Sequence, residues 1–251
     1  MRMGFSKHNV IDVFSLVIDD IDIDMFDSRI RNNKGFNFIV TPNVQHVVKL
    51  NNNKTLMECY KQACICLCDS RILQLISRLV SVSIKNVIPG SDLTKYMFET
   101  RINSSVKVMV VGSTKKDIQI VRDKYRLTNL FHYEPPMGFI NSENEIERTI
   151  NKISDVEPVY LFLALGFPRQ ELLACRLKQR LKFNCIAFCI GASIDFITGK
   201  QKRAPNFWQY MKMEWLYRFL NQPRRLFRRY FLESWGLLPL IIREIKHRFR
   251  L

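Results

Sequence analysis

This sequence has no apolar segment long enough to cross a membrane. A spanning helix needs roughly 18–20 apolar residues, and the nearest approach here is residues 235–242, which lie between Arg229 and Arg243. The first residues, MRMGFSKHNVIDVF, also lack an apolar core followed by a cleavage site. We therefore predict a protein that does not span a membrane and has no signal peptide.

Cofactor and metal signatures are missing as well. Residues 112–117, GSTKKD, lack the ending of a Walker loop, and no Gly-x-Gly-x-x-Gly occurs. Cys64, Cys66 and Cys68 alternate in an apolar run, whereas zinc ligands are normally spaced C-x2-C or wider. We therefore place these three cysteines on one face of a buried strand. The odd total of seven cysteines indicates a reducing, cytosolic setting.

Acidic residues are scarce relative to basic ones. The chain of 251 residues has 23 Asp+Glu against 39 Lys+Arg, a net charge of +16, which indicates a polyanionic partner such as nucleic acid, an anionic membrane or a phosphate-bearing substrate. Residues 199–251 hold 13 basic and 3 acidic residues, a net of +10, and residues 1–198 hold 26 and 20, a net of +6. This asymmetry predicts a core over residues 1–198 and a basic appendage over residues 199–251.

Strand-like apolar runs alternate with helix-like stretches through the core. Several runs are continuously apolar, which is typical of strands covered on both faces. We expect strands at residues 13–18, 37–40, 64–68, 106–111, 159–165 and 184–190. We expect helices at residues 92–102, 115–126, 144–153 and 169–181. The alternation predicts an α/β fold with a parallel sheet wrapped by helices.

The ends of the predicted strands are rich in glycine. Ligands of parallel α/β sheets bind outside the carboxyl ends of the strands, where glycine lets backbone approach them closely. Helices expected to start at residues 113–114 and near Pro168 would offer backbone N–H groups to a phosphate. A nucleotide site is one interpretation, and ordinary turns are the other. The strand-end glycines are Gly112, Gly138, Gly166 and Gly191.

The C-terminal segment combines basic and apolar residues at helical spacing. A helix would gather four arginines toward one side, with aromatic residues adjoining them. These arginines are Arg224, Arg225, Arg228 and Arg229. An apolar stripe follows at Leu238, Ile241, Ile242, Ile245 and Phe249, with basic residues opposite.

We interpret this segment as short interfacial membrane helices, broken at Gly236 and Pro239. The alternative is a terminal helix that docks on the core with its charges solvated. The residues expected to contact lipid are Phe227, Phe231, Trp235, Leu238 and Ile242.

Read together, the motifs resemble one known family, the bacterial WecG/TagA/CpsF glycosyltransferases, glycosyltransferase family 26. The resemblance covers the chain in order, and its most specific part runs from residue 166 to residue 230. The matching segments there are GFPRQE at 166–171, GASIDF at 191–196, GKQKRAP at 199–205, EWLYR at 214–218 and PRRLFRRY at 223–230. Earlier matches are Thr41-Pro-Asn43, the Asp of Cys68-Asp69-Ser70, and Gly90-Ser-Asp-Leu93.

The resemblance implies a Rossmann-like core and a metal-independent hexosyltransferase that needs no cofactor. Such enzymes transfer a sugar, with inversion, from a UDP-sugar to a sugar on polyprenyl diphosphate, during cell-surface polysaccharide (exopolysaccharide) synthesis. They work as peripheral proteins at the cytoplasmic face of the bacterial inner membrane. The donor sugar could be N-acetylmannosamine, its uronic acid or glucose. The Asp-x-Asp within residues 19–24 lies far from any strand end that we assign to a site, and we interpret it as surface acidity.

The resemblance also suggests roles for single residues. Asp69 is our candidate for the base that deprotonates the acceptor, with a helix N-cap as the alternative. The family usually has Gly at the position of Ser70. Thr41 and Asn43 would orient the acceptor or the sugar. The candidate nucleotide-sugar contacts, besides the strand-end glycines, are Gln170, Glu171, Asp195 and Arg203. The four arginines of residues 224–229 would stabilise the departing diphosphate.

Two other function classes compete with the transferase. A nucleic-acid-binding protein would also explain a basic helix with aromatic residues, and its binding would fall steeply with salt; the apolar stripe and the lack of a recognised motif count against nucleic acid as a partner. A catalytically inactive scaffold of a polysaccharide-assembly complex is the second, and the Ser70 departure keeps this alternative open. The donor, acceptor sugar, linkage and oligomeric state, including a homo-oligomer, stay open.

Overall fold

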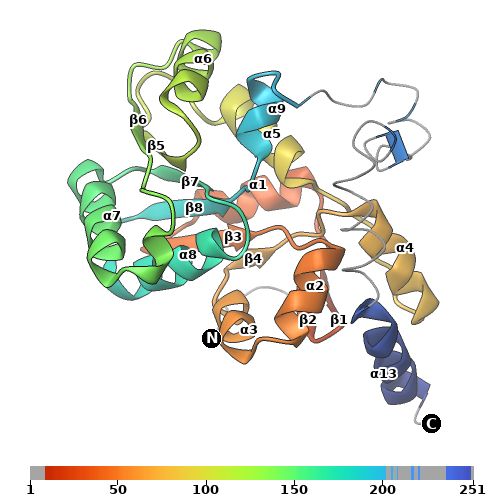
Figure 1. Cartoon of the computed structure of the whole chain (residues 1–251). Coiled ribbons are helices and arrows are strands. Elements are labelled where there is room, and N and C mark those ends of the chain that lie inside the picture. Colours follow the sequence, from red (N-terminus) through yellow and green to blue (C-terminus); the bar gives the residue numbers. More distant parts are fainter. Residues whose placement is uncertain are drawn as a thin grey trace.

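The protein is seen in a computed structural model that describes residues 9–201, 205, 208, 216–217, 220 and 236–249. At its centre is a six-stranded sheet with the strand order β4-β3-β8-β7-β5-β6, in which every neighbouring pair is parallel (Figure 1). Its strands are β3 (Phe36–Val40), β4 (Ile65–Cys66), β5 (Val108–Gly112), β6 (Leu130–Tyr133), β7 (Tyr160–Ala164) and β8 (Cys185–Cys189). The predicted parallel α/β sheet is confirmed, and β6 is a strand that the sequence did not reveal.

Helices cover both faces of the sheet because its central strands are apolar on both sides. Residues of β5 and β8 are buried throughout. One face is covered by α2 (Val44–Asn51), α3 (Lys54–Lys61), α4 (Arg71–Leu79), α7 (Glu143–Val156), α8 (Arg169–Arg180) and α13 (Leu237–Phe249). The other is covered by α1 (Ile23–Arg31), α5 (Gly90–Thr100), α6 (Lys115–Tyr125) and α9 (Ser193–Ile197). A short 3-10 turn, η2 (Phe139–Asn141), precedes α7.

The N-terminal region differs from the expected single strand at residues 13–18. It forms an antiparallel hairpin of β1 (Val10–Val13) and β2 (Leu16–Asp19). Phe14 and Ser15 make the turn, with φ values of 53° and 63°. The single-strand prediction is wrong because these two non-glycine residues adopt left-handed conformations, which sequence composition rarely signals.

The interpretation of the acidic segment at residues 19–24 as surface acidity holds for Asp22 and Asp24, which are exposed, and is wrong for Asp19. Asp19 is only 5% exposed; its carboxylate accepts hydrogen bonds from Arg29 and from the backbone N–H of Cys66. Because β4 is the end strand of the sheet, the N–H of Cys66 has no neighbouring strand to bond to on that side, and Asp19 accepts its hydrogen bond instead. The carboxylate of Asp20 accepts from the N–H groups of Lys85 and Asn86.

The cysteines of the β4 region also differ in part from expectation. Cys66 and Cys68 lie in the core on the α2 side of the sheet, whereas Cys64 packs against the core on the α5 side. Because β4 is only two residues long, the alternation does not extend to Cys64. All seven cysteines are free thiols.

The C-terminal helix α13 is continuous from Leu237 to Phe249. The predicted break at Pro239 does not occur, because Pro239 lies in the first turn, where a proline removes no intrahelical hydrogen bond. Leu237 and Leu240 are buried in the core on the α2 side, and Glu244 accepts a hydrogen bond from the N–H of Phe14. One face of α13 is thus docked on the core, beside α2 (Figure 1). Among the described helices, none has the length and apolar character that crossing a bilayer requires.

Candidate active site

Three polar side chains converge where β3, β4 and β8 end. Thr41 follows β3, Asp69 follows β4 and Ser193 follows β8. They meet at Gly90, the first residue of α5: a methyl group built on Gly90 would lie 3.1 Å from Thr41 Oγ1, 3.4 Å from Ser193 Oγ and 3.7 Å from Asp69 Oδ1. We call these four residues the Gly90 cluster. It brings two hydroxyl groups and a carboxylate to the sheet edge at which α/β proteins bind ligands.

Asp69 is held in place by backbone groups on two sides. Its Oδ1 accepts a 2.6 Å hydrogen bond from the N–H of Gly90, and its own N–H donates to the carbonyl of Pro42. Asp69 does not cap α4; that cap is Ser70, whose hydroxyl accepts from the N–H of Leu73. Ser70, which stands where the family usually has glycine, thus caps α4, and Asp69 bonds to the start of α5 instead.

The two hydroxyl groups of the cluster are more deeply placed than the carboxylate. Thr41 is 8% exposed and Ser193 is 4% exposed, while Asp69 is half-buried. Ser193 donates its hydroxyl proton to the carbonyl of Ile190, so its oxygen stays directed as an acceptor. Asn43 uses its side-chain oxygen to cap α2, where it accepts from the N–H groups of Gln45 and His46.

A buried pair lies beside the cluster at the start of α8. Gln170 Oε1 accepts a 2.8 Å hydrogen bond from the N–H of Gly191, and Gln170 Nε2 donates a 3.0 Å bond to Glu171 Oε1. Glu171 is fully buried, and its Oε2 has no hydrogen-bond partner among the described residues. Burial raises the pKa of Glu171 to about 7. Glu171 therefore offers no exposed surface to a ligand in this structure.

The strand-end glycines serve several purposes. Gly112 lies so close to β7 that an added Cβ would be 2.4 Å from the carbonyl oxygen of Ala164, so close packing explains this glycine. Gly138, Gly166 and Gly191 have φ values of 79°, 72° and 55°, which glycine adopts readily. Apart from chain neighbours, no atom of the described residues lies within 4 Å of a Cβ placed at Gly138 or Gly191.

The expected helix starts are confirmed at Thr114 for α6 and at Pro168 for α8. At the first, Thr114 and Asp117 form a capping box, and Asp117 also pairs with Lys200 at 2.6 Å. The acidic side chain therefore already occupies this helix N-terminus, which makes it less suited to a phosphate. Asp195 lies in the first turn of α9, half-buried, near the charge of Lys200.

Several predicted site residues lie outside the described residues. These are Arg203, Arg224, Arg225, Phe227, Arg228, Arg229, Phe231 and Trp235. Within the described parts of the chain, no group of three or more His, Cys, Asp or Glu side chains is placed to hold a metal ion.

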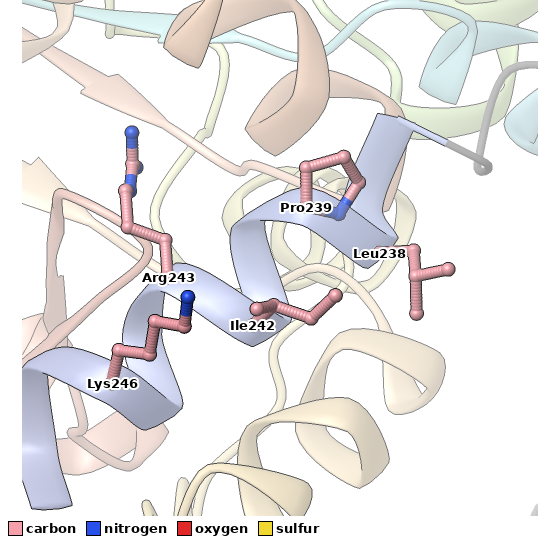
Figure 2. Close-up of a pocket in the computed structure, with 5 residues that line it drawn as sticks. All are labelled: Leu238, Pro239, Ile242, Arg243 and Lys246. Atoms are coloured by element: carbon pink, nitrogen blue, oxygen red, sulfur yellow. The ribbon is translucent and has the colours of Figure 1, made fainter. Parts of the chain in front are cut away.

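The exposed side of α13 is apolar at its N-terminal half. Leu238 is 54% exposed and Ile242 is 48% exposed. Together with Pro239, Arg243 and Lys246 they line an open hollow on the helix surface, where the basic side chains follow the apolar ones along the helix (Figure 2). The two interpretations of this segment are thus compatible, because one face docks on the core and another leaves large apolar side chains exposed beside positive charge.

Sequence reasoning missed four residues of this region. Gly90 and Ser193 were part of matched segments but were not assigned to the site, because only the fold brings the starts of α5 and α9 together. His46 and Tyr60 lie on α2 and α3, two helices that the sequence pattern did not predict. The sequence marks His46 and Tyr60 only by their polarity, because each is a polar side chain on an otherwise apolar helix face.

Known proteins are similar to this chain over most of its length. The sequence model of the Glycosyl transferase WecG/TagA/CpsF family matches residues 11–250. A protein of Bacillus spizizenii named N-acetylglucosaminyldiphosphoundecaprenol N-acetyl-beta-D-mannosaminyltransferase is 27% identical over 197 residues, 77% of this chain and 74% of the relative. A protein of the same name from Staphylococcus aureus strain MW2 is 25% identical over 193 residues, 75% of this chain and 74% of the relative. Since the match extends over nearly the whole sequence, the chain belongs to the WecG/TagA/CpsF family of glycosyltransferases.

Proposed function

We propose that this chain is an inverting glycosyltransferase that moves an N-acetylmannosamine-type sugar from a UDP-sugar to a sugar linked to polyprenyl diphosphate. The names of the two relatives support both the sugar and the acceptor class. The observation that supports catalysis by this chain is the Gly90 cluster, in which a carboxylate and two hydroxyl groups from separate strand ends meet.

Asp69 is the proposed base. Its carboxylate takes the proton of the acceptor hydroxyl as that oxygen attacks the anomeric carbon, on the face opposite the departing UDP. The new glycosidic bond forms while the bond between the anomeric carbon and the diphosphate oxygen breaks, and UDP leaves with the electron pair. Thr41 and Ser193, each within 3.4 Å of the Cβ position at Gly90, are placed to orient the reacting hydroxyl by hydrogen bonds.

The donor is proposed to lie over the ends of β7 and β8. Among the described residues no atom beyond its chain neighbours lies within 4 Å of a Cβ placed at Gly191, so a ligand can approach the backbone there, and Gln170 holds this loop. Gly166 is retained as a candidate, with the guanidinium of Arg169 3.4 Å from its Cβ position. Asp195 and Arg203 are retained as further candidates for nucleotide contacts. For the leaving diphosphate we propose stabilisation by Arg224, Arg225, Arg228 and Arg229 in place of a metal ion.

The protein is proposed to act as a peripheral protein at the cytoplasmic face of the bacterial inner membrane, where a polyprenyl-linked acceptor is anchored. Leu238 and Ile242 would enter the lipid surface, and Arg243 and Lys246 beside them would attract anionic headgroups. Each basic residue near such a surface contributes about 1 kcal/mol to binding.

Sugar transfer tests the proposal. The full-length protein is mixed with N-acetylglucosaminyl-diphosphoprenol in detergent or lipid, and UDP release is followed with UDP-N-acetylmannosamine, its uronic acid and UDP-glucose in turn. We expect release with one donor that depends on the acceptor. No release with any of the three, alongside an active control transferase, would contradict the proposal.

A further inference from the structure

A buried chain of polar side chains connects two walls of the candidate site. It begins on α2 with His46, whose Nδ1 lies 2.9 Å from the hydroxyl of Tyr60 on α3. The Tyr60 hydroxyl donates to Glu171 Oε1 at 3.5 Å, and Glu171 accepts from Gln170, which accepts from the N–H of Gly191. We call these four side chains the relay. It joins α2, which follows Thr41, to the loop that leads to Ser193.

The direction of each hydrogen bond in the relay is fixed by the next. The two ends of the Gln170 amide face unlike partners, the carbonyl toward an N–H donor and the amino group toward a carboxylate. A flipped amide would place donor against donor at Gly191 and acceptor against acceptor at Glu171. Because the Tyr60 proton is directed at Glu171, His46 is assigned the tautomer with the proton on Nδ1.

These side chains are almost without contact to solvent. Tyr60 and Gln170 are each 2% exposed, Glu171 is fully buried and His46 is 9% exposed. The imidazole of His46 also stacks on Phe167, with ring centroids 4.0 Å apart and 15° between planes. Buried polar groups destabilise a fold unless they are hydrogen-bonded, and a network of them fixes one arrangement of the backbone it joins. Here that backbone is the start of α8 and the loop after β8.

We propose that His46, Tyr60 and Glu171 are positioning residues for the transfer reaction. They hold the Gln170 amide with its carbonyl on the N–H of Gly191, and so keep the loop carrying Ser193 against Thr41 and Asp69 in the Gly90 cluster. None of the three touches substrate. The kinetic test of this inference rests on the proposed function, whereas the test of how the Gly191 loop is held does not.

The test compares three variants of the full-length protein with a matched control. Glu171→Gln keeps an amide oxygen that can accept from Gln170, while Glu171→Leu keeps the size and removes the acceptor. Tyr60→Phe removes one hydroxyl from the middle of the relay. The control is Tyr160→Phe at the amino end of β7, whose ring packs edge-on against Phe188.

Two readouts are taken from each variant, kcat and KM for transfer, and the hydrogen-exchange rate of the Gly191 amide by NMR. We expect Glu171→Leu to lower kcat about tenfold with KM within about twofold, and to speed exchange at Gly191 about tenfold, as loss of one buried hydrogen bond implies. We expect Tyr60→Phe to lower kcat about threefold and to speed exchange at Gly191 about threefold. Glu171→Gln and the control stay near the wild type.

The exchange rate separates failure of this inference from failure of the proposed function. If the wild type transfers no sugar, exchange at Gly191 still tests the relay. Unchanged exchange in both Glu171→Leu and Tyr60→Phe would overturn the inference, as would a kcat loss in Glu171→Gln equal to that in Glu171→Leu. Because Tyr60→Phe removes a single atom, it keeps the test decisive if Glu171→Leu does not fold.

Discussion

Replacing Gly90 by alanine places one methyl group at the centre of the proposed site. The new Cβ would lie 3.1 Å from Thr41 Oγ1 and 3.4 Å from Ser193 Oγ, so the Thr41 hydroxyl must move by a few tenths of an ångström. Gly90 starts α5 and its backbone is not in the left-handed region, so alanine suits the helix. We expect the steric cost and the gain of about 0.4–1 kcal/mol from a stiffer unfolded chain to offset each other.

The expected signature is therefore lost activity in a stable protein. The melting temperature should stay within about 4 °C of the wild type. The value of kcat/KM should fall at least about tenfold, which corresponds to about 1.4 kcal/mol of transition-state stabilisation. Thermal unfolding followed by circular dichroism, together with UDP release, measures both quantities.

Gly35→Ala is the matched control, because it should show the opposite signature. Gly35 lies before the amino end of β3 with φ at 69°, and in the described parts of the chain no atom beyond its chain neighbours lies within 4 Å of an added Cβ. Alanine there costs about 1–2 kcal/mol of stability through backbone strain and leaves the distant site intact. Wild-type kcat/KM in Gly90→Ala would refute the placement of the reaction at the Gly90 cluster.

Three further predictions concern stability, membrane binding and metal dependence. Burial raises the pKa of Glu171 from 4.5 to about 7, so the stability contributed by the protonated carboxyl is fully present below pH 4.5 and is lost as pH rises through 7. In urea unfolding, the free energy of unfolding of the wild type relative to Glu171→Gln should fall by about 3 kcal/mol between pH 4.5 and 8. The same pH dependence of that free energy in both proteins would contradict this prediction. Replacing both Leu238 and Ile242 by glutamate should abolish flotation with anionic vesicles while circular dichroism stays unchanged, since both side chains are about half exposed; retained flotation would exclude this face of α13. Treatment with EDTA should leave sugar transfer unchanged, and loss restored by a divalent cation would contradict transfer without a metal.

The sequence was sufficient to predict those strands of the sheet that are buried on both faces. Strands such as β5 and β8 are apolar throughout because helices cover both faces, and that makes them visible as continuous apolar runs. The hairpin was invisible for the opposite reason, since its turn depends on left-handed Phe14 and Ser15 rather than on glycine. Asp19 looked like surface charge because the backbone N–H from which it accepts, that of Cys66, is 47 residues away in the sequence.

The site was predictable only in part for a similar reason. Thr41 and Asp69 were identified at strand ends, and the fold brings them to the same point. Gly90 and Ser193 complete that point through contacts between segments about 100 residues apart, which no local pattern encodes. The relay is less visible still, because a tyrosine on an amphipathic helix has the same local pattern whether its hydroxyl meets water or a buried carboxylate.

The central claim is that Asp69 deprotonates the acceptor. Transfer of radiolabelled sugar to the lipid-linked acceptor tests it most directly, with Asp69→Asn as the variant and Asp155→Asn, an exposed aspartate on α7, as the control. Loss of a general base lowers rates by about 10²–10⁴-fold. We predict a fall of at least about 100-fold in kcat for Asp69→Asn and wild-type transfer by Asp155→Asn. Transfer by folded Asp69→Asn at the wild-type rate would contradict the account.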